Sequence, residues 1–156
     1  MTYDEKCHNF LNVAKNIAQM STCQFTKVGC LIVTPEFKPV SFGYNGTISG
    51  ACHCGSISMS RDEHLKFSDE REIHAEMNAI LQADRDKLKG SIVFTTITPC
   101  ANCLKHLAAA GVGKVYSGGV YWRYNQNDLM NLGLKAESFG IQLFIESEDG
   151  SDFYTP

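Results

Sequence analysis

The apolar residues of the N-terminal part follow first a helical and then a strand-like spacing. The run at 28–33 is apolar and β-branched and predicts a strand, and a turn at 34–39 leads into a return strand at 40–43. The turn-rich segment 43–46 ends this hairpin. Before the hairpin, residues at helical intervals predict an amphipathic helix over 3–20: Cys7, Phe10, Leu11, Ala14, Ile17 and Ala18.

The rest of the chain alternates between helices and strands after a long polar stretch. Residues 47–72 are polar and irregular, which is typical of a functional or disordered loop. The pattern then predicts a helix from His74, a strand at 91–96, a helix from Cys100 to Gly111, a strand at 114–120, a helix over 129–139 and a strand at 141–146.

A hairpin followed by alternating strands and helices predicts an α/β fold. We expect a three-layer α/β/α sandwich around a five-stranded mixed sheet, with strand order 2-1-3-4-5. The last strand is reached through a helix and should run parallel to its predecessor. Residues 1–146 then form a single domain, and residues 147–156, which are acidic and polar, form a loose C-terminal tail.

Composition narrows the functional class. The formal net charge is −3 and no block of Lys or Arg occurs, so we expect no nucleic-acid partner. Residues 1–6 are polar rather than a signal peptide, and no apolar run reaches membrane-spanning length, so we expect no membrane partner. Seven cysteines without a secretion signal favour a reducing, cytoplasmic location with metal-bound thiolates.

Two short motifs offer three ligands for one zinc ion. His74-Ala75-Glu76 supplies an imidazole, and Pro99-Cys100-Ala101-Asn102-Cys103 supplies two thiolates. A catalytic zinc site keeps its fourth position open for water, and Glu76 is placed to exchange protons with that water. Thr98 as N-cap and Pro99 as first helical residue would start the second helix, with both cysteines on one face. A redox cysteine pair or a structural zinc are the alternative interpretations.

The chain resembles the deoxycytidylate (dCMP) deaminases of the cytidine and deoxycytidylate deaminase superfamily. The zinc motifs are those of the zinc-dependent base deaminases. The resemblance to the dCMP branch rests on Lys27-Val28-Gly29, on Gly43-Tyr44-Asn45-Gly46 and on residues 73–80, and it covers residues 5–146. It implies a cytidine deaminase-like fold and zinc-dependent hydrolysis of dCMP to dUMP and ammonia, which supplies thymidylate synthesis. Other deaminases of the superfamily (tRNA adenosine, cytidine or free-base) and a non-catalytic zinc-binding module remain the alternatives.

The resemblance also implies roles for residues around the zinc. Glu76 is the catalytic acid and base, the Ala75 N–H holds a pyrimidine oxygen, and the Thr98 carbonyl holds the amine. Asn45 is expected to contact the deoxyribose 3′-hydroxyl, although a turn asparagine fits the same position. The sequence itself offers three donors for the 5′-phosphate, each of which is also compatible with an ordinary surface residue: Thr26, Lys27 and Tyr121.

Enzymes of this family are typically hexamers that dCTP activates and dTTP inhibits, so the resemblance implies a homo-oligomer with both nucleotides as effectors. Tyr44 and Gly46 are the implied regulatory residues. Arg85, at the far end of the helix that starts at His74, is a candidate for an effector phosphate or is simply a solvated helix-terminal cation.

The remaining cysteines and histidines suggest a second, structural zinc. Because the first two strands are antiparallel, Cys23 and the pair Cys52 and Cys54 fall at the same end of the sheet. By resemblance to some viral and bacterial dCMP deaminases, the ligands would be Cys23, Cys54, His64 and Glu72, with His53 or Cys52 as replacements for His64. Free thiols and a solvated histidine are the alternative.

Overall fold

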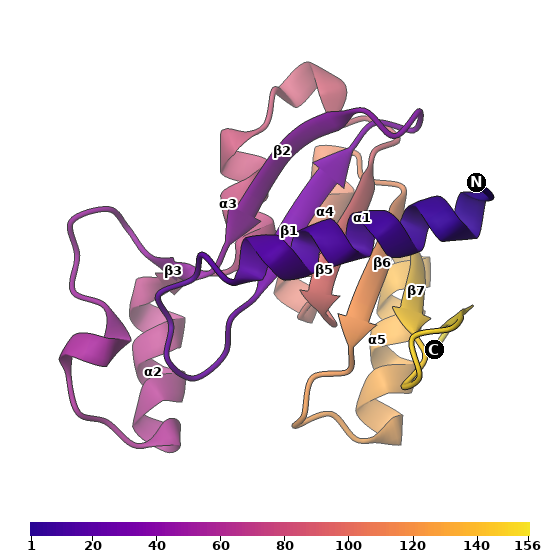
Figure 1. Ribbon diagram of the computed structural model, residues 1–156. Coiled ribbons are helices and arrows are strands. Elements are labelled where there is room, and N and C mark those ends of the chain that lie inside the picture. Colours follow the sequence, from indigo (N-terminus) through magenta and orange to yellow (C-terminus); the bar gives the residue numbers. More distant parts are fainter.

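The computed structural model describes residues 1–156, and a mixed sheet of six strands runs through its centre (Figure 1). The strand order is β2-β1-β5-β6-β7-β8. β5, β6 and β7 are mutually parallel, and β1 is antiparallel to both β2 and β5. The strands are β1 (Gly29–Val33), β2 (Pro39–Tyr44), β5 (Ile92–Ile97), β6 (Lys114–Gly119), β7 (Gln142–Glu146) and β8 (Phe153–Tyr154).

The predicted α/β fold, the 2-1-3-4-5 order of the first five strands and the parallel final pair are confirmed, but the sheet has one strand more than predicted. The extra strand comes from the predicted tail: Phe153 and Tyr154 pair with Glu146 and Ile145. Phe153 also stacks on His8 with ring centroids 4.2 Å apart. The stacking of Phe153 on His8 therefore holds in place a segment that was predicted to be a loose tail from its polar composition.

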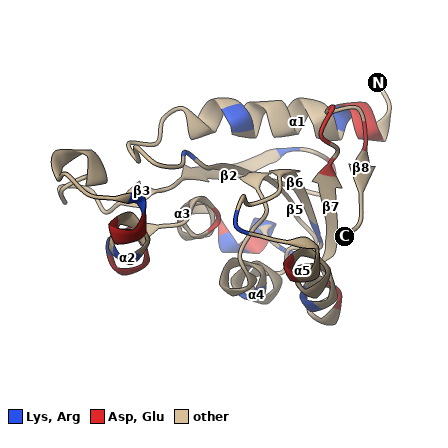
Figure 2. Ribbon diagram, turned by 90° about the horizontal axis from the view of Figure 1, so that it is seen from below, with Lys and Arg blue, Asp and Glu red and all other residues tan.

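Helices cover the sheet on both faces (Figure 2). α1 (Tyr3–Ala18) lies on one face, and α3 (Ala75–Gln82), α4 (Ala101–Ala110) and α5 (Gln126–Ser138) lie on the other. A hydrophobic core lies on each face of the sheet, and alternate residues of a strand belong to different cores. Leu31 and Phe94 face α1, whereas Ile32 and Val93 face α3, α4 and α5. None of the helices combines the length and the apolar character that crossing a membrane requires.

The stretch 47–72, predicted as an irregular loop, contains a helix. It comprises β3 (Gly46–Thr47), the 3₁₀ turn η1 (Cys54–Ser56), α2 (Arg61–Arg71) and β4 (Glu72–Ile73), which pairs with β3. α2 begins with a capping box in which the Ser60 hydroxyl accepts the Glu63 N–H at 3.1 Å. Only His64 of this helix is buried, so no apolar stripe reveals it in the sequence.

The hairpin strand β2 packs closely against α3, and this contact positions the start of α3. A side chain at Gly43 would place its Cβ 2.5 Å from the Ala79 nitrogen and 2.6 Å from the Ala75 oxygen. Only glycine permits this approach of strand and helix backbones. The first turn of α3, which carries Ala75 and Glu76, is thereby fixed against the sheet.

Candidate functional site

The three predicted zinc ligands meet where α3 and α4 begin. His74 is the N-cap of α3, Cys100 is the N-cap of α4, and Cys103 lies in the first turn of α4. The Nδ1 atom of His74 is 3.3 Å from the Cys103 sulfur and 3.7 Å from the Cys100 sulfur. Tetrahedral zinc with ordinary bond lengths places nitrogen and sulfur ligands about 3.6 Å apart. The side chains therefore fit one zinc ion.

The predicted start of α4 is wrong by two residues. The helix begins at Ala101, and its N-cap is Cys100 rather than Thr98. The Cys100 sulfur accepts the Cys103 N–H at 3.3 Å, so the motif caps its own helix and leaves Pro99 outside it. Thr98 instead accepts the Tyr121 N–H at 2.9 Å through its hydroxyl, which ties the segment after β6 to the site.

The electrostatics of the three side chains suit a divalent cation. A hydrogen bond from Cys103, together with His74, lowers the pKa of the Cys100 thiol to about 4 despite its burial. The same bond raises the pKa of Cys103, and hydrogen bonding to Cys100 raises the pKa of His74 to about 8. Cys100 therefore favours the thiolate form, and a bound divalent cation would favour loss of the Cys103 proton as well.

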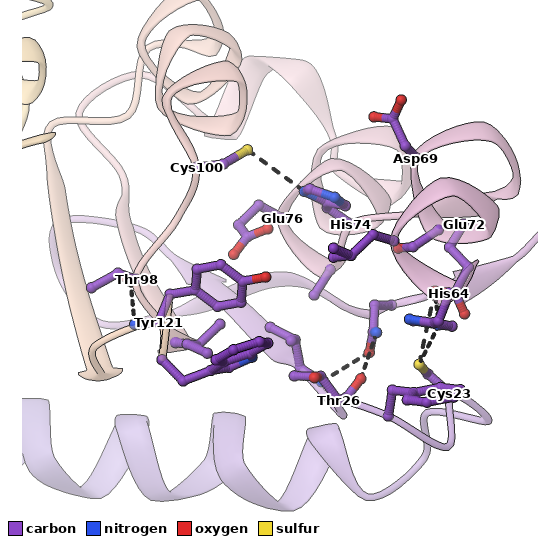
Figure 3. Close-up of a pocket in the computed structure, with 18 of the residues that line it drawn as sticks. Cys23, Thr26, His64, Asp69, Glu72, His74, Glu76, Thr98, Cys100 and Tyr121 are labelled. Atoms are coloured by element: carbon purple, nitrogen blue, oxygen red, sulfur yellow. Dashed lines mark hydrogen bonds and ion pairs between the residues drawn. The ribbon is translucent and has the colours of Figure 1, made fainter. Parts of the chain in front are cut away.

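Glu76 lies beside His74 and Cys100, as predicted (Figure 3). Its side chain belongs to the first turn of α3 and is only 3% exposed. The hydroxyl of Thr95, a fully buried residue of β5, donates a 2.7 Å hydrogen bond to one Glu76 carboxylate oxygen. Thr95 is not predicted from the sequence, because its position in an apolar strand gives no sign of its partner.

A cavity of about 310 Å³ opens in front of the cluster. Its lining includes His74, Glu76 and Cys100 together with Ala75 and Thr98, the two residues predicted to orient the base. The N–H groups in the first turn of α3 have no acceptor within the helix, so the Ala75 N–H is free to bind a ligand. The volume suits a small molecule such as a nucleotide.

The predicted sugar and phosphate ligands divide into two groups. Asn45, Thr26 and Tyr121 line the cavity, whereas Lys27 is exposed and does not. The Asn45 amide accepts the Val28 N–H and donates to the Thr26 carbonyl, both at 2.8 Å. Asn45 therefore shapes the cavity wall, and its contact with a sugar hydroxyl stays a prediction.

The cavity is also lined by an arginine and by aromatic rings that were not predicted from the sequence to be site residues. Arg61 comes from the first turn of α2, and Trp122 and Tyr124 come from the segment between β6 and α5. Arg61 was missed because its stretch was predicted to be irregular. The aromatic run Tyr121-Trp122-Arg123-Tyr124 was the available signal, since stacked rings suit a cavity that binds a planar base.

The four residues proposed as ligands of a second metal also come together. The Cys23 sulfur is 3.3 Å from His64 Nε2, 3.8 Å from Glu72 Oε1 and 3.9 Å from the Cys54 sulfur. His64 Nε2 is 3.1 Å from Glu72 Oε1. The ligand atoms all lie within 4.8 Å of one another, as four-coordinate zinc requires.

The chemistry of this second cluster also fits a cation. Burial raises the pKa of the Cys23 thiol to about 11, so its ionised form needs a compensating positive charge. The Gln24 N–H points at the Cys54 sulfur at 3.3 Å, a hydrogen bond that supports a thiolate ligand. Cys52 and His53, the alternative ligands, are exposed and outside the cluster, and His53 instead contacts the Thr22 hydroxyl at 3.1 Å.

Of the residues proposed for regulation, Tyr44 and Gly46 adjoin α3 and the residues just before it. The Tyr44 carbonyl accepts a 2.8 Å hydrogen bond from the Asn78 side chain on α3. Gly46 pairs with Ile73, the residue before His74. Arg85 is exposed in the 3₁₀ turn η2 (Arg85–Lys87), beyond the end of α3.

Comparison with known families gives a match over residues 4–119 to the model described as the cytidine and deoxycytidylate deaminase zinc-binding region. The chain is 36% identical over 110 residues to ComE operon protein 2 of Bacillus subtilis, which covers 69% of this chain and 56% of that protein. It is 33% identical over 114 residues to the deoxycytidylate deaminase of Mycobacterium phage D29, covering 68% of this chain and 88% of that enzyme.

The fold also matches a solved structure, that of the dCMP deaminase of cyanophage S-TIM5 in complex with dCMP and dUMP. The TM-score is 0.70 at 27% sequence identity, and the match covers 93% of this chain and 98% of the phage chain. The likeness therefore extends over nearly the whole fold.

Proposed function

Because the chain belongs to the cytidine and deoxycytidylate deaminase zinc-binding family, we propose that it is a zinc-dependent hydrolase that removes the C4 amine of dCMP, giving dUMP and ammonia. The observation that carries this proposal is the buried carboxylate of Glu76 beside His74, Cys100 and Cys103, at the wall of a nucleotide-sized cavity. A closed structural zinc site would have no use for that carboxylate.

Glu76 would act as both base and acid. Zinc held by His74, Cys100 and Cys103 would lower the pKa of a water molecule and so provide a nucleophile near neutral pH. Glu76 accepts the proton released from that water and passes it to ring N3, so that C4 becomes electrophilic and the nucleophile adds to it. Glu76 then takes the hydroxyl proton of the resulting C4 adduct and gives it to the amine, so that the C–N bond breaks, ammonia leaves and the C4 carbonyl forms. The Thr95 hydroxyl holds one carboxylate oxygen and leaves the other for these transfers.

Backbone groups on both sides of Glu76 would orient the base. The N–H of Ala75 donates to the pyrimidine carbonyl oxygen, and the carbonyl of Thr98 accepts from the exocyclic amine. Both residues are buried and line the cavity, so their polar groups face a site from which water is largely excluded. Hydrogen bonds in such a site discriminate strongly against bases that lack the matching group.

The second cluster would hold a structural zinc. Cys23 precedes β1, Cys54 lies in η1, and His64 and Glu72 lie within and just after α2. One ion would join these segments where the apolar core does not reach, because His64 is the only buried residue of α2. Three of the four ligands also line the cavity, so this ion would support the substrate site.

The regulatory part of the proposal is a homo-oligomer, a hexamer, that dCTP activates and dTTP inhibits. The hexamer and the two effectors are proposed from the family resemblance. A regulatory role of segment 43–46 is supported by its contacts, in which Gly43 packs on α3, Tyr44 accepts from Asn78 and Gly46 pairs with Ile73. An effector that moved this segment would displace the helix that carries Glu76. Arg85 is a candidate for the effector phosphates.

Ultraviolet absorbance assays test the proposed activity. The zinc-loaded protein is mixed separately with dCMP, dCTP, deoxycytidine and cytosine, each with and without dCTP or dTTP as effector. We expect turnover of dCMP well above that of the other three compounds, faster with dCTP and slower with dTTP. A preference for deoxycytidine or cytosine would identify a different deaminase of the family, and no turnover of any compound would refute the proposal.

A further inference from the structure

We propose that Arg61 binds the 5′-phosphate of the substrate and thereby makes the enzyme select deoxynucleoside monophosphates over nucleosides. This inference rests on the proposed function, since it assigns a further residue of the same cavity. Arg61 is the one lysine or arginine among the 20 residues that line the cavity. Lys27, the cation that the sequence suggested, lies outside it.

The charge of the cavity makes such a cation necessary. Asp69 and Glu76 line the same space with their carboxylates. Glu72 lines it as well, and even with a zinc ion bound, this carboxylate and two cysteine thiolates would leave the second cluster with a net negative charge. A phosphate dianion would be repelled by these groups in surroundings that screen charge less well than water. A guanidinium offsets that repulsion and adds directed hydrogen bonds.

Two aromatic rings hold the arginine while leaving its hydrogen-bond donors unused. The guanidinium carbon is 5.7 Å from the centroid of Phe25 and 5.2 Å from that of Trp122. Cation–π contact occupies the flat faces of a guanidinium, whereas its five N–H groups lie in the plane and point outward. The side chain is thus held in place with its planar fork available to a phosphate.

No carboxylate neutralises Arg61. None of the four ion pairs of the molecule includes it. The adjacent carboxylate, Asp62, contacts Arg123 at 3.4 Å instead. An arginine that lines a cavity, lies over two aromatic rings and lacks an anionic partner is arranged to receive an anionic ligand.

The position of Arg61 also agrees with the other phosphate candidates. Phe25 directly precedes Thr26, and Trp122 directly follows Tyr121, so Arg61 lies between the two segments that carry these hydroxyls. In Figure 3, Thr26 lies across the cavity from Cys100 and Glu76. A nucleotide with its base at Glu76 would therefore extend its phosphate toward Arg61.

The second cluster fixes this arrangement. The His64 ring stacks on Phe25 with centroids 4.3 Å apart, and His64 is one helical turn after Arg61 on α2. Phe25 is therefore held between the histidine of the cluster and the guanidinium. The same contacts therefore anchor α2 and position Arg61 for the phosphate.

The test compares two substrates in the wild type and three variants of the zinc-loaded enzyme. The values of kcat/KM for dCMP and for deoxycytidine are measured for the wild type, Arg61→Met and Arg61→Lys, and the binding of dUMP and deoxyuridine is measured by calorimetry. The matched control is Arg123→Met, because Arg123 stacks on the same Trp122 ring at 4.5 Å but does not line the cavity.

We expect Arg61→Met to lower kcat/KM for dCMP on the order of 100-fold and to weaken dUMP binding similarly, because a bidentate charged hydrogen bond is lost. The values for deoxycytidine and deoxyuridine should stay within about threefold, since those ligands carry no phosphate. For Arg61→Lys, kcat/KM for dCMP should lie between the values of the wild type and Arg61→Met. Arg123→Met should leave the ratio of kcat/KM for dCMP to kcat/KM for deoxycytidine unchanged.

If Arg61→Met leaves the ratio of kcat/KM for dCMP to kcat/KM for deoxycytidine unchanged, the inference is overturned. This includes the case in which both values fall by the same factor. Failure of the proposed function looks different. The wild type itself would then show no turnover of dCMP or no preference for it over deoxycytidine, and the inference would fall with it.

Discussion

Replacement of Cys54 by alanine tests whether the second cluster holds a zinc ion. The wild type should contain about two zinc ions per chain and Cys54→Ala about one, because three remaining ligands hold a structural zinc poorly. Cys54 is buried and does not line the substrate cavity, so the substitution removes a ligand without touching the base-binding groups.

The expected loss of stability follows from the ligand set. Structural zinc sites bind with about 10–16 kcal/mol, and because the ion is lost together with its ligand, the share of one ligand of four, roughly 3 kcal/mol, is the least by which the free energy of unfolding should fall. For a domain of this length, each kcal/mol shifts the midpoint of thermal unfolding by about 2–4 °C, so we expect Tm to fall by at least about 6–12 °C. The contact between His64 and Glu72 at 3.1 Å does not involve Cys54, so we expect it to persist in the variant and to keep α2 partly anchored.

Metal analysis and thermal unfolding of purified protein check this expectation, with Cys52→Ala as the matched control. Cys52 lies two residues away, is exposed and stands outside the cluster. Its removal should leave zinc content and Tm unchanged. One zinc per chain in the folded, active wild type would refute the reasoning, and so would a Cys54→Ala variant that keeps the wild-type zinc content.

Two further substitutions probe how the catalytic carboxylate is held. In Gly43→Ala the new Cβ would lie 2.5 Å from a backbone nitrogen of α3, so we expect kcat to fall by about tenfold or more and stability by about 1–3 kcal/mol, measured by steady-state kinetics and denaturant unfolding. An unchanged kcat would show that the strand contact does not position α3. In Thr95→Val the hydrogen bond to Glu76 is lost at constant side-chain shape, so kcat should fall by about tenfold while KM stays within about twofold. Thr95→Ser should restore kcat, and equal kcat values for the valine variant and the wild type would contradict the assignment.

The sequence predicts the zinc centre well because its ligands lie in two short segments whose local structure is strongly encoded. His74 and Glu76 share one helical turn, as do Cys100 and Cys103, and the hydrophobic period places both helices. The strand order followed from the alternation of strands and helices. The start of α4 was wrong because a cysteine took the capping role normally filled by Thr or Ser.

The missed features depend on long-range contacts or on polar local signals. α2 has only one buried residue, so its capping box at Ser60 and Glu63 was the single local sign of it. β8 depends on the packing of Phe153 against His8, which lies far away in the sequence. Arg61 and Thr95 acquire their importance from partners that only the folded chain brings near them.

The zinc content and dCMP turnover of Glu76→Gln test the central claim most directly. Glutamine keeps an oxygen that can accept the Thr95 hydroxyl but loses the proton-transferring carboxylate. We predict the wild-type zinc content together with a loss of kcat of at least about 10³-fold. A fully zinc-loaded Glu76→Gln enzyme that turns over dCMP at nearly the wild-type rate would contradict the account.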